Sequence, residues 1–387
     1  MPECKIFICT GFYLPGFKGG GPIRTIANMV DQLGNEFNFA LYTADRDLGD
    51  AAPYASIQRN AWQSVGKAEV VYASPEPGWI SRLWKNIASF EGNTIHLNSF
   101  FAFRFGILPL IFWRILKPGA AIILGPRGEF SEGALNLKKR KKKFFISVAK
   151  TLGLYKNILW HASSDFEAAD IRRVMGSNVK IHVAIDIASP KAEMTLKERW
   201  PGAPLRIVFV SRISPKKNLL GAIDALKKIK SQVVFDIYGP AEDQNYWAQC
   251  QESAKLLPQN IRFQYCGALQ PMQVPDKLAE YDLFFLPTLG ENFGHVIAEA
   301  LSSGLPVLIS DTTPWRDLAE KSLGWDIPLN EVDRFAECIE ACAAKSPEEY
   351  IQWRQSIRAW ALKNIGNQDA IEQNRRLFLN LDSPHEH

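Results

Sequence analysis

The sequence predicts an α/β protein built from two doubly wound, Rossmann-like domains. Its 387 residues are enough for about two domains, each with its own core. Short apolar runs of strand length alternate with segments of helical periodicity, and several runs end in glycine turns. The stretch 189–204 mixes Pro, Lys, Glu and Gly without an apolar period, which is typical of a linker. We therefore expect an N-terminal domain at 1–188, a C-terminal domain at 205–365 and a final helix within 366–387.

The composition is that of an ordinary globular protein, with 47% hydrophobic and 22% charged residues. A formal charge of +4 argues against a protein that is basic all over, and six scattered Cys without a close pair suggest neither a zinc site nor a disulfide framework. We expect a reducing cytoplasm and no signal peptide. The most apolar window, 100–116, is interrupted by Arg104 and Arg114 and is short for a membrane span. It predicts a buried or membrane-facing helix.

The N-terminal domain opens with a strand at 5–9 and a glycine loop containing Gly16, Gly19, Gly20 and Gly21. Pro22 then starts a helix with apolar residues at helical spacing. Strand, glycine loop and helix bring main-chain amides close to a phosphate, although a plain turn explains the glycines equally well. Further strands are predicted at 39–43, 70–73, 94–97, 120–124, 158–163 and 179–187.

Polar side chains follow two of these strands. Asn98 comes just after 94–97, and Arg127 and Glu129 come just after 120–124, where ligand contacts cluster in such sheets. A local surface ion pair explains Arg127 and Glu129 equally well. We interpret His96 as a core histidine with a hydrogen-bond partner, and we expect it to face the opposite side of the strand from the substrate.

A run of six basic residues precedes an apolar helix led by two Phe residues; the run comprises Lys138, Lys139, Arg140, Lys141, Lys142 and Lys143. Such a run is usually a solvated face. It is also the composition that binds anionic lipid, with each cation adding about 1 kcal/mol near the surface. No base-stacking or groove-reading motif accompanies it, so we rank a membrane surface above nucleic acid.

The C-terminal domain restarts with a strand at 205–210, which ends in Arg212 and Lys217 before a helix. Two cations there are suited to neutralise a diphosphate, Arg by a planar fork and Lys as a point charge. The alternative is a pair of surface cations. Strands at 233–238 and 261–265 end in glycine turns, and from Pro328 the chain is mostly helical.

The stretch 283–310 predicts strand, loop, helix and strand, with Glu291 in the loop and Glu299 on the helix. Amides at the start of this helix favour an anion such as a diphosphate. Two carboxylates beside that anion would repel it, so we expect them to accept hydrogen bonds from hydroxyls. A diphosphate between two sets of hydroxyls describes a nucleotide-sugar.

The segment ENFGHVIAEALSSGLPV, with Glu291 and Glu299 eight residues apart, resembles the donor-site signature of retaining glycosyltransferases of family 4, which have the GT-B fold. Ser211 and Arg212, with Lys217 five residues after Arg212, are similar to another element of that family. The resemblance implies two domains facing each other across a cleft, with the last helix crossing back to the N-terminal domain. It implies catalytic roles for Arg212, Lys217 and Glu291, and donor contacts from Gly19, Gly20, Gly21, Gly267, Leu269, Asn292, Phe293, Gly294, His295 and Glu299.

The acceptor or sugar side is implied to include Asn98, Arg127 and Glu129. Many family members have His-x-His where this chain has His96-Leu97-Asn98, and the change removes a titratable group. The Pro-Arg-Gly at 126–128 is similar to that of enzymes that build bacterial surface polysaccharides. The expected donor is a UDP- or GDP-sugar and the expected acceptor a lipid-linked saccharide, at the inner face of the membrane.

We expect transfer with retention by front-face displacement, because no carboxylate is placed as an evident nucleophile. No cofactor and no metal are expected, since the one Asp-x-Asp triplet, Asp45-Arg46-Asp47, lies early in the N-terminal domain. One rival is a nucleotide-sugar epimerase, which needs acid and base groups that the sequence does not reveal. Another is a catalytically idle sugar-nucleotide or glycan-binding subunit, favoured by Asn98. A nicotinamide enzyme is disfavoured because no strand is followed by the full glycine fingerprint.

Overall fold

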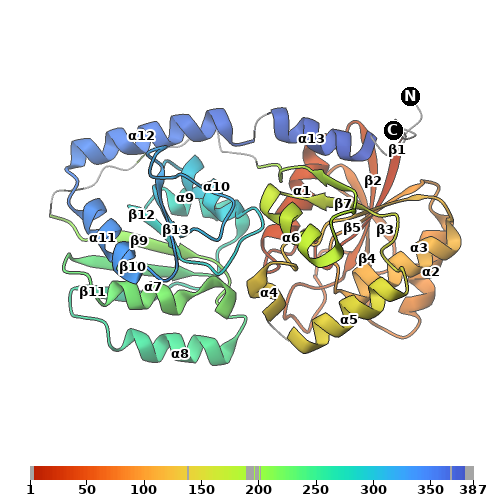
Figure 1. Cartoon of the computed structure of the whole chain (residues 1–387), viewed down its shortest axis with the longest axis horizontal. Coiled ribbons are helices and arrows are strands. Elements are labelled where there is room, and N and C mark those ends of the chain that lie inside the picture. The colour runs from red at the N-terminus through yellow and green to blue at the C-terminus, as the bar shows by residue number, and fades with distance from the viewer. Residues whose placement is uncertain are drawn as a thin grey trace. The chain divides into compact units, whose positions relative to one another are not determined.

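The computed structural model describes residues 4–136, 139–188, 196, 200, 202–366 and 368–379. The chain divides into two compact units (Figure 1). Unit 1 comprises Met1–Ile187 and Gln368–His387, and unit 2 comprises Ala188–Asn367. Most of the expected linker, at 189–195, 197–199 and 201, lies outside the described residues, as does Lys138 of the basic run.

The core of unit 1 is an eight-stranded sheet in the order β3-β4-β2-β1-β5-β6-β7-β8. Every pairing is parallel except that of β3 with β4. The strands are β1 (Cys4–Cys9), β2 (Phe37–Ala44), β3 (Trp62–Val65), β4 (Ala68–Ala73), β5 (Thr94–Leu97), β6 (Ala121–Leu124), β7 (Leu159–Ala162) and β8 (Ile181–Val183). The edge strand β3 alternates exposed and half-buried residues, so it lacks the continuous apolar run that predicts the buried strands.

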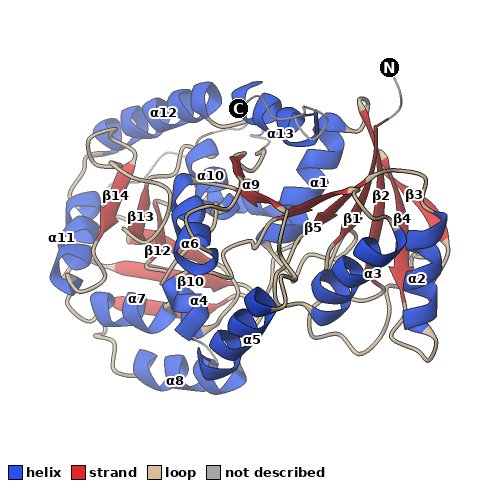
Figure 2. Ribbon diagram, turned by 45° about the vertical axis from the view of Figure 1, so that its right-hand side comes forward, coloured by secondary structure: helices blue, strands red, loops and turns tan. Residues whose placement is uncertain are grey.

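Helices cover both faces of this sheet (Figure 2). One face packs against α2 (Trp79–Ser89), α3 (Leu108–Leu116), α5 (Lys139–Thr151) and α6 (Asp165–Met175). The other face packs against α1 (Gly21–Leu33) and α13 (Gln368–Leu379). The short helix α4 (Glu132–Asn136) precedes α5.

The last helix, α13, belongs to unit 1 although unit 2 precedes it in the chain. Its Phe378 is buried, and the ring centroid lies 5.4 Å from that of Phe37 and 5.8 Å from that of Phe39, both on β2. At the surface, Arg375 forms an ion pair with Glu36 at 2.6 Å. The expectation that the last helix returns to the N-terminal domain is therefore confirmed.

Unit 2 has a parallel six-stranded sheet in the order β11-β10-β9-β12-β13-β14. Its strands are β9 (Leu205–Val210), β10 (Val233–Tyr238), β11 (Ile261–Tyr265), β12 (Leu283–Leu286), β13 (Val307–Ser310) and β14 (Gly324–Ile327). The helices are α7 (Leu219–Leu226), α8 (Gln244–Ala254), α9 (Val274–Leu278), α10 (His295–Ser302), α11 (Val332–Ala343) and α12 (Pro347–Asn364). The two mainly parallel sheets confirm the α/β, doubly wound class.

One expectation from the sequence needs correction. The last strand of unit 1 spans only Ile181–Val183, and the chain from 184 to 188 runs on without regular structure. The apolar window at 100–116 is helical as expected, with a helical turn at Phe103–Ile107 followed by α3. In the part of the chain that the structure describes, no helix is both long enough and apolar enough to cross a membrane.

Candidate active site

The loops after β9 and β12 are joined by hydrogen bonds at the carboxyl edge of the unit 2 sheet. The carbonyl oxygen of Lys216 accepts from the Leu289 amide at 2.8 Å and from the Thr288 hydroxyl at 3.0 Å. Asn218, in the left-handed region at φ 54°, caps α7 and donates through Nδ2 to the Pro287 carbonyl at 2.9 Å. These contacts bring residues 217 and 291 together from distant parts of the sequence.

Lys217 and Glu291 form an ion pair through Nζ and Oε1. Each side chain is only 12% exposed, so solvent screens the pair weakly. Burial acts to raise the pKa of the Glu291 carboxyl, but the charges of Lys217, Lys216 and Arg212 outweigh it, and the pKa is lowered from its ordinary value. Glu291 is therefore a carboxylate that can accept but not donate hydrogen bonds.

Arg212, at the end of β9, meets a carboxylate that the sequence analysis missed. Its Nη1 donates to both oxygens of Glu242, at 3.0 and 2.9 Å, and both side chains are about one-third exposed. Glu242 follows β10, the neighbouring strand, so its place just beyond a strand end was the available signal. A ligand that uses the Arg212 guanidinium must share it with Glu242 or displace that carboxylate.

The start of α10 is held by a glycine and an aromatic cluster. Gly294 lies in the left-handed region at φ 81°, and a Cβ there would lie 2.9 Å from Cδ1 of Ile297. The Trp315 indole donates to the Phe293 carbonyl at 2.6 Å, and the Phe293 ring packs on both Trp315 and His295. The first turn of a helix carries amides without acceptors inside the helix and a partial positive charge, which together suit an anion.

The remaining predicted donor residues of unit 2 lie around this helix and at the end of β11. Asn292 is half-buried in the loop before α10, and Glu299 is half-buried within α10. Gly267 lies at φ 78°, and its carbonyl accepts from the Gly239 amide at 2.9 Å. Leu269 is half-buried against the core. Their contact with a donor stays a prediction.

The glycine loop of unit 1 is fixed by an acidic residue. The amides of Phe17 and Lys18 donate to Oδ2 of Asp47 at 2.7 and 3.0 Å. The two amides that precede Gly19 are therefore already hydrogen-bonded to a carboxylate. Gly20 lies at φ 72° before α1, and a Cβ on Gly19 would lie 3.0 Å from Ile23 and 3.1 Å from Phe12. Gly21 is the first residue of α1. The sequence analysis singled out Asp47 only as part of an Asp-x-Asp triplet.

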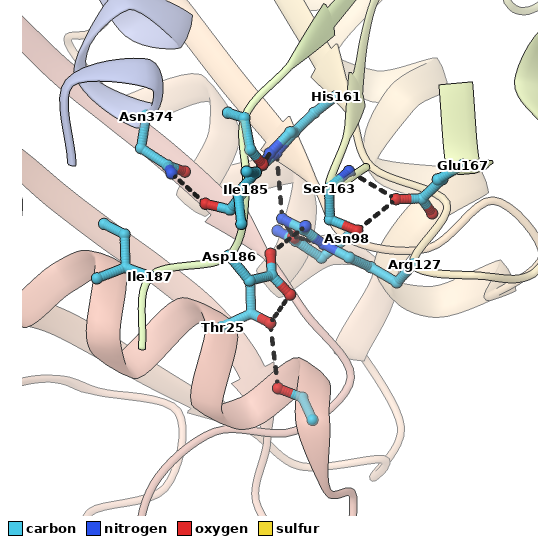
Figure 3. A network of polar contacts seen from close by, with 12 residues as sticks. Thr25, Asn98, Arg127, His161, Ser163, Glu167, Ile185, Asp186, Ile187 and Asn374 are labelled. Carbon is cyan, nitrogen blue, oxygen red and sulfur yellow. Dashed lines mark hydrogen bonds and ion pairs between the residues drawn. The ribbon is translucent and has the colours of Figure 1, made fainter. Parts of the chain in front are cut away.

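A buried network lies at the carboxyl ends of β5, β6 and β7, with Arg127 at its centre (Figure 3). The Arg127 guanidinium donates to Oδ1 of Asn98 through Nε at 3.0 Å and Nη2 at 2.9 Å. Its Nη1 lies 3.2 Å from Oδ1 of Asp186, and both side chains are almost completely buried. Oδ2 of Asp186 accepts from the Thr25 hydroxyl of α1 at 2.7 Å. Arg127 is therefore a buried residue that connects Asn98 to Asp186, and the alternative of a surface ion pair is wrong.

Two neutral histidines continue this network. His161 on β7 accepts at Nδ1 from Arg127, 3.2 Å away, because a guanidinium can only donate, so its Nε2 carries the proton and donates to the Ala184 carbonyl at 3.0 Å. Burial and the Arg127 charge lower the pKa of His161 to about 3. His96 lies 3.3 Å from the same Nδ1, and burial lowers its pKa well below the ordinary value.

These contacts correct one expectation and confirm another. His96 is a core histidine with a partner, as expected. The expectation that it faces away from the substrate side is wrong, because His96 and Asn98 join the same network through His161 and Arg127. Residues two apart on a strand share a face. Neither His161 nor Asp186 was predicted, although Asp186 comes soon after the end of β8 and His161 lies near the end of β7.

Two further carboxylates of unit 1 hold its loops. Glu129 accepts from the Ser99 hydroxyl at 2.7 Å and from the amides of Phe100 and Phe101 at 2.6 and 3.2 Å. Glu167 of α6 accepts from the Gly128 amide at 2.7 Å and from Ser163. Burial raises the pKa of both carboxyls despite these hydrogen bonds. Both side chains are thus used in shaping the loops around Asn98 and Arg127.

The basic run opens α5, and the helix exposes an apolar stripe. Phe144, Val148 and Leu152 are exposed at four-residue spacing, with Phe144 at 72% and Leu152 at 76%. Exposed cations accompany them at Lys139, Arg140, Lys141 and Lys143. Lys142 differs, because its Nζ donates to the Ala134 carbonyl at 2.8 Å and lies 4.8 Å from the Phe101 ring centre.

Residues 191–360 match the model of the family described as glycosyl transferases group 1. Among curated proteins, the chain is similar to the phosphatidyl-myo-inositol mannosyltransferase of Mycolicibacterium smegmatis, with 27% identity over 185 residues, or 46% of each chain. It is also similar to the protein of the same name from Mycobacterium leprae, with 25% identity over 49% of this chain and 54% of the relative. The matched segment thus spans about half the length of these curated relatives.

Solved structures resemble the whole chain. The HepE protein of Anabaena, in a complex with UDP-glucose, aligns at a TM-score of 0.71 and 17% identity, covering 99% of this chain and 100% of that one. The sucrose-phosphate synthase of Thermosynechococcus elongatus aligns at 0.70 and 15% identity, covering 98% and 99%. These likenesses confirm the GT-B fold.

Proposed function

We propose that this chain, whose second unit matches the group 1 glycosyltransferases, transfers a hexose-type sugar from a UDP- or GDP-sugar to a hydroxyl acceptor with retention. The observation that carries the proposal is the Lys217–Glu291 pair beside the start of α10. A cation and a helix N-terminus there suit the diphosphate of a nucleotide-sugar, and a carboxylate suits its sugar hydroxyls.

In this proposal, Lys217 and Arg212 stabilise the charge that develops on the leaving diphosphate, and the first amides of α10 add to their effect. Glu291 accepts hydrogen bonds from the sugar hydroxyls, because its lowered pKa keeps it ionised. Glu299 holds the ribose hydroxyls. The Lys217–Glu291 ion pair keeps both groups in position before the donor arrives, so little reorganisation accompanies the reaction.

Retention by front-face displacement is supported by how unit 1 uses its titratable groups. Asp186 is paired with Arg127, and Glu129 and Glu167 hold backbone amides. Buried His161 accepts from Arg127 and has a pKa of about 3, so it is a poor base at neutral pH. The neutral amide of Asn98 cannot act as a base. The leaving phosphate is then the natural acceptor of the proton from the attacking hydroxyl. Metal independence remains part of the proposal.

The decisive experiment is a product assay combined with thermal-shift measurements on the pure protein. UDP, GDP and their common sugar conjugates are tested with the native chain and with Lys217→Met and Glu291→Gln. We expect one nucleotide to stabilise the native chain by mass action, and both variants to lose transfer. Glu291→Gln should keep nucleotide binding, because in this proposal Glu291 contacts the sugar of the donor and not its nucleotide.

Lys255→Met is the matched control, because Lys255 pairs with Glu252 on the exposed face of unit 2. It should leave both shift and product unchanged. A nucleotide shift without transfer from any donor would favour the second candidate, a catalytically idle sugar-nucleotide-binding subunit, which Asn98 motivates. Absence of any nucleotide shift would refute both.

The acceptor side of the proposal places the enzyme at an anionic membrane surface, acting on a lipid-linked saccharide in surface-polysaccharide assembly. The support is the exposed stripe of Phe144, Val148 and Leu152, flanked by Arg140 and Lys141. Apolar side chains enter the interface while the cations stay at the lipid headgroups. No nucleic acid is proposed as a partner.

Vesicle sedimentation tests this surface. The native chain should bind vesicles of phosphatidylglycerol and phosphatidylcholine, and Phe144→Ser with Leu152→Ser should reduce binding at least about tenfold, since each buried large side chain contributes about 2 kcal/mol. Leu256→Ser, which removes a similarly exposed side chain from unit 2, should have no effect. Equal binding by both variants would refute the membrane role of α5.

A further inference from the structure

Unit 1 has a cavity of about 490 Å³ that the proposed transfer reaction does not use. Its lining comes from the first residues of β1, β2 and β4, from the edge strand β3 and from the end of α2. The amino ends of the parallel strands therefore surround it. The carboxyl ends, where Asn98 and Arg127 lie, are at the opposite edge of the sheet, so this cavity is separate from the acceptor side described above.

Aromatic side chains form part of the cavity lining. Trp62 is 40% exposed, and its ring meets Phe7 edge to face at 6.4 Å. Phe90 also lines the cavity, with its ring centre 5.2 Å from that of Phe7. Trp62 and Ser64 lie on one face of β3 because they are two residues apart, and Ser64 is paired with Glu69 on β4. A partly exposed indole thus stands beside polar side chains.

The polar lining is rich in hydrogen-bonding groups and carries no net charge. Lys5 pairs with Glu91 at 2.6 Å, and Lys67 offsets Glu69. Amides and hydroxyls complete the lining with Asn38, Asn86, Ser64 and Ser89. The Asn86 amide is oriented because its Nδ2 donates to the Arg82 carbonyl at 2.8 Å, which leaves Oδ1 for another donor.

The lining favours a sugar over a phosphate or a lipid tail. A phosphate would meet two carboxylates as well as two ammonium groups, so its charge gains little. A lipid tail would bury polar groups without hydrogen bonds, which is costly. A sugar ring fits both features: its C–H face packs on the electron-rich face of an indole, and its hydroxyls exchange hydrogen bonds with amides and carboxylates.

We infer that this cavity is a saccharide-binding site for a neutral sugar chain, distinct from the donor and acceptor sites. Trp62 is the stacking platform, and Asn86 and Glu69 bind the hydroxyls. The volume is that of an ordinary small-ligand site, which holds one or two sugar rings. The inference does not depend on the transferase activity, because every residue that it uses lies in unit 1 between β1 and Glu91, just after α2.

Saturation-transfer NMR and titration calorimetry on the full chain test the site with maltotriose, chitotriose and glucose 6-phosphate as probes. At least one neutral trisaccharide should bind, and Trp62→Ala should weaken its Kd about tenfold, the contribution of one aromatic contact. Trp62→Phe should restore most of the affinity because it keeps a ring. Trp84→Ala is the matched control, since Trp84 is 37% exposed on α2 and does not line the cavity.

Three results would overturn the inference: no binding by either trisaccharide, an unchanged Kd in Trp62→Ala, or tighter binding by glucose 6-phosphate. The stabilisation of unit 2 by a nucleotide should survive Trp62→Ala and be lost in Lys217→Met. Trisaccharide binding should show the reverse pattern. Failure of this inference and failure of the proposed transfer reaction are therefore distinguishable.

Discussion

Acidification should destabilise unit 1 through His161, whose imidazole is buried between Arg127, His96 and the Ala184 carbonyl. Its pKa is about 3 in the folded chain, against about 6.5 in an unfolded chain. Between these two pKa values, the histidine is protonated in the unfolded chain and neutral in the native chain. The free energy of unfolding therefore falls as the pH drops below 6.5, and this contribution is fully present only above that value.

The size of this effect follows from linkage. One proton of difference costs about 1.4 kcal/mol per pH unit, so lowering the pH from 6.5 to 5 removes about 2 kcal/mol through His161 alone. His96 has a pKa lowered in the same direction and adds to the loss. Glu129 and Glu167 act oppositely, because a raised carboxyl pKa makes the native chain bind protons more readily as the pH falls.

The assay compares urea unfolding of the native chain and of His161→Gln at several pH values between 7.5 and 5. Hydrogen exchange of the β7 amides then reports the local stability of the strand that carries His161. The variant keeps an acceptor and a donor but cannot titrate, so the difference between the two slopes isolates His161. Below pH 6.5 we expect the native slope to become steeper, approaching a difference of about 1.4 kcal/mol per pH unit near pH 5. Equal slopes, or an imidazole of His161 that titrates near pH 6.5 by NMR, would refute the reasoning.

Three further predictions concern unit 2. Lys217→Met should raise the pKa of Glu291, since its nearest counter-charge is lost, and carboxyl NMR of the native and variant chains measures the shift. Arg354→Met should lower the stability of unit 2 by about 3 kcal/mol, because the buried guanidinium donates to the carbonyls of Gly304, Ser303 and Ala279; thermal unfolding checks this, and an unchanged Tm would contradict it. Gly294→Ala should strain the start of α10 and weaken nucleotide binding several-fold in calorimetry, whereas equal affinity would mean that this turn does not contact the donor.

The sequence predicts the fold well because parallel strands buried on both faces read as continuous apolar runs. The strands β5, β9, β10 and β11 were predicted at their observed bounds. The edge strand β3 was missed, since exposed Trp62 and Ser64 alternate with half-buried residues and give no such run. The strand at β8 was predicted too long, because apolar residues continue beyond it, whereas only Ile181–Val183 pair with β7.

The candidate site was predicted less completely, because sequence spacing places a residue at a strand end but does not reveal its partners. Glu242 and Asp186 pair with the two predicted arginines, Arg212 and Arg127, across 30 and 59 residues of chain. Each pairing depends on which strands are neighbours, and strand order is a property of the whole sheet. The orientation of Lys142 similarly depends on the packing of α5, which a charge run does not encode.

The return of α13 to unit 1 sets an order of events during synthesis. The 180 residues from Ala188 to Asn367 leave the ribosome between the first part of unit 1 and the helix that completes it. At about 5–20 residues per second this interval is about 10–40 s. Throughout it, Phe37 and Phe39 lack the aromatic ring of Phe378 that covers them in the finished molecule. Until α13 emerges, chaperones and other chains can therefore contact the face of the nascent sheet that carries Phe37 and Phe39.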